Sequence, residues 1–95
     1  MINLHTRVSR APRVGWREIE NITYLVEPQT TTLHRLNPTG STVWKLIETE
    51  MTLEQIIKYF KENYTGNLSE VEKDVMEFIN SMHEKKLIAL HENEP

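Results

Sequence analysis

The 95-residue chain contains no cysteine, only three glycines and no long apolar run. Without cysteine it can form neither disulfides nor thiolate zinc sites, and it has no cysteine nucleophile. Gly15, Gly40 and Gly66 are too far apart to form a phosphate-binding loop. No apolar run approaches the roughly 20 residues that a membrane span requires, and residues 1–20 lack the apolar segment of a signal peptide. We therefore expect a cytoplasmic protein without a membrane anchor.

The other side chains that often carry chemistry do not form a catalytic pattern either. His5, His34, His83 and His91 are scattered, and no two of them stand at the helical spacing that metal ligands use. None of the serines lies in a nucleophile-elbow sequence. We therefore predict that the protein is not an enzyme and that it needs neither a metal nor another cofactor.

The first part of the chain predicts three strands. Residues 13–19 and 22–27 alternate apolar and polar side chains, and residues 30–36 are rich in β-branched residues. Short turns at residues 20–21 and 28–29 would connect them as an antiparallel meander. Leu33 and Leu36 are an odd number of residues apart, so the sequence does not decide which face of the third strand is buried.

The rest of the chain predicts three helices, each announced by a capping signal. The signals are Asn37 with Pro38, Thr52 with Gln55, and Ser69 with Glu72. The helices would span about residues 38–48, residues 53 to the stop signal at 66–67, and residues 69–86. Residues 87–90 are apolar and would pack back on the fold or form a fourth short strand.

These elements predict one small α+β domain. Residues 1–12 show no sustained periodicity and end at Pro12, so we expect a flexible N-terminal arm, a domain over residues 13–90 and a frayed segment over residues 91–95. The fold class is winged helix-turn-helix-like, a three-stranded antiparallel β-meander followed by three α-helices.

The charge distribution separates the functions that such a fold could have. Residues 1–47 contain six basic and three acidic residues, whereas residues 48–95 contain five basic and eleven acidic residues. A winged-helix DNA-binding regulator needs basic residues on its reading helix, but the third predicted helix holds five acidic residues against three lysines. In a second interpretation, an extended peptide adds to the edge of the third strand, beside the apolar flank of the third helix. In a third, a second copy of the chain pairs with the same edge.

An ordered set of motifs makes the chain resemble a known family. The motifs are Leu36-Asn37-Pro38-Thr39-Gly40, Val43-Trp44-Lys45-Leu46-Ile47, Thr52-Leu53-Glu54-Gln55-Ile56, Tyr64, Val71-Glu72-Lys73-Asp74-Val75, Phe78-Ile79 and Leu87-Ile88. Over about residues 13–90, this order resembles the PqqD family of small peptide chaperones, also called RiPP recognition elements. Two connections depart from the family pattern, because residues 28–30 replace a common Pro-Glu-Gly and residues 48–50 replace a common Asp-Gly.

The resemblance implies a function and a binding site. The protein would be a non-catalytic chaperone that binds the leader of a ribosomally made precursor peptide by strand addition. Independently of the resemblance, we expect a monomer, with an edge-paired dimer as the alternative. It would present that peptide to a modifying enzyme, commonly a radical SAM protein, in pyrroloquinoline quinone synthesis or in another peptide-modification pathway. Nucleic acid and membrane partners are not expected. The implied groove consists of Thr31, Thr32, Leu33, His34 and Arg35 on the third strand and Lys73, Met76, Ile79, Asn80 and His83 on the third helix.

Overall fold

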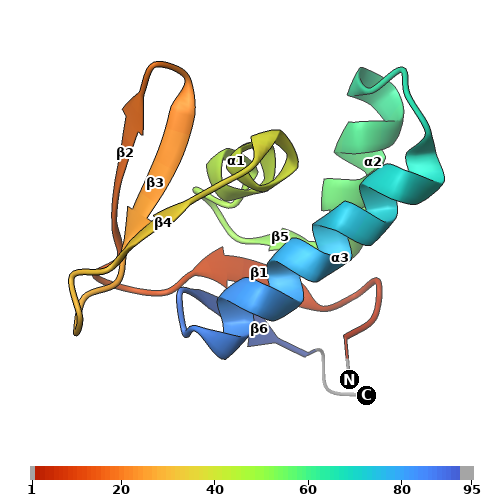
Figure 1. Ribbon diagram of the computed structural model, residues 1–95. Coiled ribbons are helices and arrows are strands. Elements are labelled where there is room, and N and C mark those ends of the chain that lie inside the picture. The colour runs from red at the N-terminus through yellow and green to blue at the C-terminus, as the bar shows by residue number, and fades with distance from the viewer. Residues whose placement is uncertain (1, 93–95) are drawn as a thin grey trace.

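Two three-stranded sheets and three helices make up the computed structural model, which describes residues 2–92 (Figure 1). One sheet has the order β2-β3-β4 and the other the order β5-β1-β6. The elements are β1 (Arg7–Arg10), β2 (Gly15–Ile19), β3 (Ile22–Val26), β4 (Leu33–Arg35), α1 (Pro38–Leu46), β5 (Met51–Thr52), α2 (Leu53–Asn63), α3 (Leu68–Glu84) and β6 (Ile88–His91). Within residues 2–92, none of the helices has the length and apolar character that a membrane span requires.

The predicted antiparallel meander is confirmed as the β2-β3-β4 sheet. β2 and β3 pair over their whole lengths, and the two residues between them, Glu20 and Asn21, both have positive φ angles, 51° and 68°, as a tight hairpin turn demands. β4 begins later than predicted, at Leu33, because Thr31 has a φ of 56° that interrupts the extended backbone. The Thr30 hydroxyl also accepts a hydrogen bond from the backbone N–H of Thr32, which favours a turn over a strand.

The second sheet corrects the prediction of a flexible arm over residues 1–12. Residues 7–10 form β1, the central strand of this sheet, which pairs with β6 from Arg7↔His91 to Arg10↔Ile88. Val8 is completely buried. The sequence pattern missed this strand because three of its four residues are polar and its partners come from the distant end of the chain. β6 confirms the predicted short strand near residues 87–90 and includes His91, while residues 93–95 of the expected frayed segment lie outside the described residues.

The three predicted helices are confirmed, with one cap in a different place. The Asn37 side chain caps α1, and Thr52 and Gln55 form the predicted capping box of α2. α3 is capped by Asn67 instead of Ser69, because the Asn67 side-chain oxygen accepts a hydrogen bond from the backbone N–H of Glu70. These observations confirm the α+β class; the winged helix-turn-helix description stays a prediction.

Close contact between α1 and α3 sets the shape of the region beside β4. A Cβ atom placed on Gly40 of α1 would come within 2.7 Å of Cδ1 of Phe78 on α3, so only glycine permits this approach. Trp44, one turn further along α1, is completely buried in the core between the helices and the sheets. β4 leads into α1 through Leu36 and Asn37, so the same contact holds the end of β4 near α3.

Arg10 of one sheet contacts both α1 and the other sheet. Its guanidinium group donates hydrogen bonds of 3.1 and 2.8 Å to the backbone carbonyl of Trp44. The same group lies 4.6 Å from the centre of the Trp44 ring and 5.2 Å from that of Trp16 on β2. Burial lowers the pKa of Arg10, and the nearby Glu48 carboxylate opposes this shift. One side chain of β1 thus holds β2 and α1 together.

We expect Arg10→Lys to lower the free energy of unfolding by about 1–3 kcal/mol, although it keeps the charge, because lysine loses the two-pronged donation and the flat stacking surface. Urea unfolding followed by circular dichroism measures the change. Arg13→Lys, at an exposed position, is the matched control and should change stability by less than about 0.5 kcal/mol. Equal effects of the two substitutions would contradict the role given to Arg10.

Candidate functional site

The edge of β4 that faces away from β3 is open. Glu27 donates its backbone N–H to the carbonyl of Thr32, and Leu36 donates to the carbonyl of Thr23, each at 2.9 Å. In an antiparallel pair these bonds alternate along the strand. The pairs Val26↔Leu33 and Tyr24↔Arg35 are therefore the non-hydrogen-bonded ones. The backbone N–H and C=O groups of Leu33 and Arg35 consequently point away from β3, and no other strand of residues 2–92 pairs with β4.

A hollow of about 230 Å³ lies between the end of β4 and α3. We call it the β4–α3 hollow; its lining comprises Arg35, Leu36, Asn37, Asp74, Glu77, Phe78, Ser81 and Met82. Phe78 and Met82 are 9% and 7% exposed and supply its apolar part. Asp74 and Glu77 are exposed, and neither forms an ion pair with any other residue in the described range 2–92. The hollow thus combines an apolar floor with a net negative charge.

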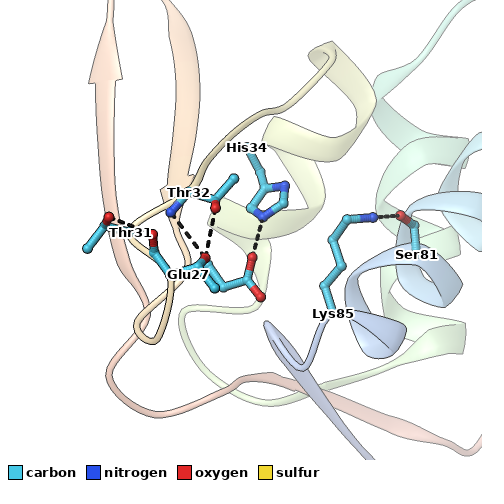
Figure 2. A network of polar contacts seen from close by, with 7 residues as sticks. Glu27, Thr31, Thr32, His34, Ser81 and Lys85 are labelled. Atoms are coloured by element: carbon cyan, nitrogen blue, oxygen red, sulfur yellow. Dashed lines mark hydrogen bonds and ion pairs between the residues drawn. The ribbon is translucent and has the colours of Figure 1, made fainter.

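A polar network holds the opposite end of β4 (Figure 2). The His34 ring nitrogen Nε2 donates a 2.9 Å hydrogen bond to the Glu27 carboxylate, across the loop that leads into β4. This hydrogen bond is the main reason why the pKa of Glu27 lies below its ordinary value. Lys85, just beyond α3, donates to the Ser81 hydroxyl at 3.0 Å and lies close enough to Glu27 to lower that pKa further. This end of β4 is therefore tied to its loop and lies next to a lysine.

The structure places the predicted strand residues at the open edge. Leu33, His34 and Arg35 form β4, with Thr31 and Thr32 just before it. Leu33 is 62% exposed, whereas His34 points to the other face of the sheet and is half-buried. Of the ten predicted site residues, only Arg35 also lines the β4–α3 hollow.

The predicted helix residues do not line this hollow and lie on the other flank of α3. Ile79 is completely buried in the core and Met76 packs against that core. Lys73, Asn80 and His83 are exposed. At 100° per residue, this set is turned by roughly 160° around the helix from the residues that line the hollow. The sequence showed which stripe of α3 is buried, but it did not show which of the two flanks of that stripe lies beside β4. Peptide binding by the predicted helix residues stays a prediction.

The α3 residues of the β4–α3 hollow were not predicted as site residues, but they share a spacing that is visible in the sequence. Asp74 and Phe78, Glu77 and Ser81, and Phe78 and Met82 are spaced four apart, so they follow one side of α3. This spacing shows that they form a row, but the contact with β4 is a tertiary property.

The outer face of the β2-β3-β4 sheet, opposite the core, is apolar and exposed. Ile19 and Leu33 are 51% and 62% exposed, and Tyr24 and Val26 between them are half-buried. These residues line a hollow of their own, of about 560 Å³. A strand added beside β4 would extend this face as well as cover the β4–α3 hollow.

No group of three or more histidine, aspartate and glutamate side chains within residues 2–92 is placed to hold a metal ion. The arrangement offers backbone hydrogen bonds at one strand edge, an apolar floor and fixed charges. These are the elements of a peptide-binding site.

Three solved structures share this fold. A structure described as TbiB1 in complex with the TbiA(beta) leader peptide is 25% identical, covers 92% of this chain and 99% of its own, and has a TM-score of 0.73. The PqqD part of Methylobacterium extorquens PqqCD, described as a stand-alone RiPP recognition element, is 19% identical, with coverages of 94% and 95% and a TM-score of 0.75. A lasso peptide synthetase B1 complexed with the leader peptide is 14% identical, with coverages of 86% and 96% and a TM-score of 0.70.

A comparison with curated protein sequences found no match. The model of the family described as coenzyme PQQ synthesis protein D (PqqD) matches residues 23–88, well over half of the chain. This range begins in β3, contains β4 and all three helices, and ends at the first residue of β6. The family resemblance of the sequence is thereby confirmed: the chain belongs to the PqqD family.

Proposed function

We propose that this protein is a leader-peptide chaperone, which binds a ribosomally made precursor peptide and presents it to the enzyme that modifies it. The observation that carries the proposal is the open edge of β4 beside the β4–α3 hollow. Membership of the PqqD family supports it, as do the leader peptides in the descriptions of two structures of the same fold.

The guest peptide binds as a fourth strand of the β2-β3-β4 sheet. Its backbone pairs with the free N–H and C=O groups of Leu33 and Arg35, which supplies affinity that does not depend on the peptide's sequence. Successive side chains of a strand point to opposite faces. Half of the guest's side chains therefore face α3, and the other half extend the outer apolar face next to Leu33, so both faces select the guest.

The loop before β4 prepares the edge for the guest. The His34–Glu27 hydrogen bond and the bond from Glu27 N–H to the Thr32 carbonyl hold β4 in place without a partner. Because these contacts exist before binding, the guest does not have to order the strand, and less of the binding free energy is spent on that step.

DNA binding and pairing with a second copy of the chain are the competing functions. None of the comparisons supports DNA binding, and α3 carries uncompensated acidic residues where a reading helix needs basic ones. A second copy would occupy the edge of β4 and give a dimer, which analytical ultracentrifugation would detect. The radical SAM class of the modifying enzyme, the pathway and the cytoplasmic location remain predictions from the sequence.

The experiment that tests the proposal is a selection of random peptides, about 12 residues long so that they reach past both ends of β4, on the immobilised full chain. We expect enriched sequences that bind as extended strands. A labelled peptide from this selection, here called the selected peptide, serves as the probe in fluorescence polarisation. A selection without enrichment would contradict the proposed function.

Leu33→Pro should weaken binding of the selected peptide at least about tenfold, because proline removes a free backbone donor from the open edge. The β3-β4 pairing should survive, since the Leu33 N–H takes no part in it. Leu33→Ala is the matched control, which keeps the donor and shortens the side chain. If both variants bind equally well and circular dichroism shows both folded, strand addition at this edge is wrong.

Ser81→Arg and Asn80→Arg distinguish the two flanks of α3. Ser81 lines the β4–α3 hollow, whereas its neighbour Asn80 lies on the flank expected from the sequence. A long charged side chain at position 81 should block the hollow and weaken binding about tenfold or more, while Asn80→Arg should change it less than about twofold. The reverse result would return the groove to the flank expected from the sequence.

The Glu27–His34 contact gives the site a dependence on acid pH. Its hydrogen bond lowers the pKa of Glu27 in the folded chain below the ordinary value of 4.5. The resulting stabilisation is complete above that value and is lost as the pH falls through the lowered pKa. We therefore expect binding of the selected peptide to weaken below about pH 4.5. Glu27→Gln should bind the selected peptide more weakly near neutral pH and should lose this part of the pH dependence. If the variant has the same pH profile as the parent, the Glu27–His34 contact does not hold β4.

A further inference from the structure

The two ends of β4 face opposite charges. Beyond its C-terminal end, the β4–α3 hollow contains Asp74 and Glu77 against Arg35, a local charge of −1. Before its N-terminal end, a second hollow is lined by Pro12, Arg13, Glu27, Pro28, Gln29, Lys85 and Lys86, which carry a local charge of +2. Glu84, the last residue of α3, lines neither hollow. A peptide on the edge of β4 therefore lies in a field that changes sign along its length.

The spacing of these charges along α3 and its C-cap can be converted into a spacing on the guest. Glu77 and Lys85 are eight residues apart, which corresponds to about 12 Å along a helix axis. A strand rises about 3.3 Å per residue, so the same distance covers about four residues. Residues four apart in a strand point to the same face, whereas residues three or five apart do not. Four is therefore the spacing that turns two guest side chains toward α3 together.

The direction of the guest decides which charge comes first. Antiparallel pairing is the more stable arrangement per residue, and it places the guest's N-terminus at the C-terminal end of β4. That end lies beside Asp74 and Glu77, and the following residues then run toward Lys85 and Lys86.

We propose that the site selects leader segments in which a basic side chain precedes an acidic side chain by four residues. The basic side chain pairs with Asp74 and Glu77, and the acidic one with Lys85 and Lys86. This inference rests on the proposed function, because it assigns the chemistry of the guest at the same edge.

The test repeats the peptide selection on the parent chain and on the variant Asp74→Lys/Glu77→Lys. Sequences enriched on the parent should carry Lys or Arg at one position and Asp or Glu four positions later. At the first of these two positions, sequences enriched on the variant should lose the preference for Lys or Arg and gain a preference for Asp or Glu. The preference at the second position should not change. The variant Glu54→Lys/Glu62→Lys makes the same change in net charge at exposed positions of α2 and should keep the parent's pattern.

Defined peptides then measure the size of the effect. Replacing the basic residue of the selected peptide by Glu should weaken binding to the parent about two- to fivefold and strengthen binding to Asp74→Lys/Glu77→Lys by a similar factor. Three results would each overturn the inference. The enriched peptides could lack the spaced charges, they could carry the acidic residue first, or their pattern could be the same on the parent and on the variant. Those outcomes leave the proposed function standing as long as Leu33→Pro still weakens binding at least about tenfold, whereas loss of that effect would remove both.

Discussion

The register between β3 and β4 is the constraint on which the site depends. It directs the backbone groups of alternate residues toward β3 and leaves those of Leu33 and Arg35 for a guest. A shift by one residue would exchange these roles and turn every side chain of β4 to the other face of the sheet. His34 would then lose Glu27, and Leu33 would be taken from the outer face. The tight turn at Glu20 and Asn21 sets the β2-β3 pairing, and the loop at residues 27–32 sets that of β3 with β4.

The rest of the molecule holds α3 at a fixed place beside this edge. β1, β5 and β6 form a second sheet against the helices, and Arg10 joins that sheet to β2 and to α1 through Trp16 and Trp44. The contact between Gly40 and Phe78 then brings α1 and α3 together, so that the hollow opens next to Leu36 and Asn37. Residues that never touch a guest thus determine the width of its site.

A site of this kind separates affinity from selection. The strand edge offers hydrogen bonds that any extended peptide can use, so its side-chain surroundings must distinguish one peptide from another. The apolar floor of Phe78 and Met82 favours apolar side chains, and the charges at the two ends of β4 favour a particular order of charged ones. Paired charges at an accessible site contribute modestly to affinity but strongly to register and direction. A chaperone that passes its guest to an enzyme benefits from that combination, because it aligns the peptide without holding it too tightly.

The sequence by itself determined the local structure and the family. Turn residues, N-caps and alternation predicted the hairpin and three helices, because these signals act between neighbours in the chain, and the order of motifs from Leu36 to Ile88 indicated the function. Only the tertiary structure decided that residues 7–10 form a central strand, since their partners lie at residues 51–52 and 88–91. It also decided which flank of α3 faces β4. Both flanks border the same buried stripe, and the choice between them depends on how α1 packs against Phe78, a contact between residues almost forty positions apart.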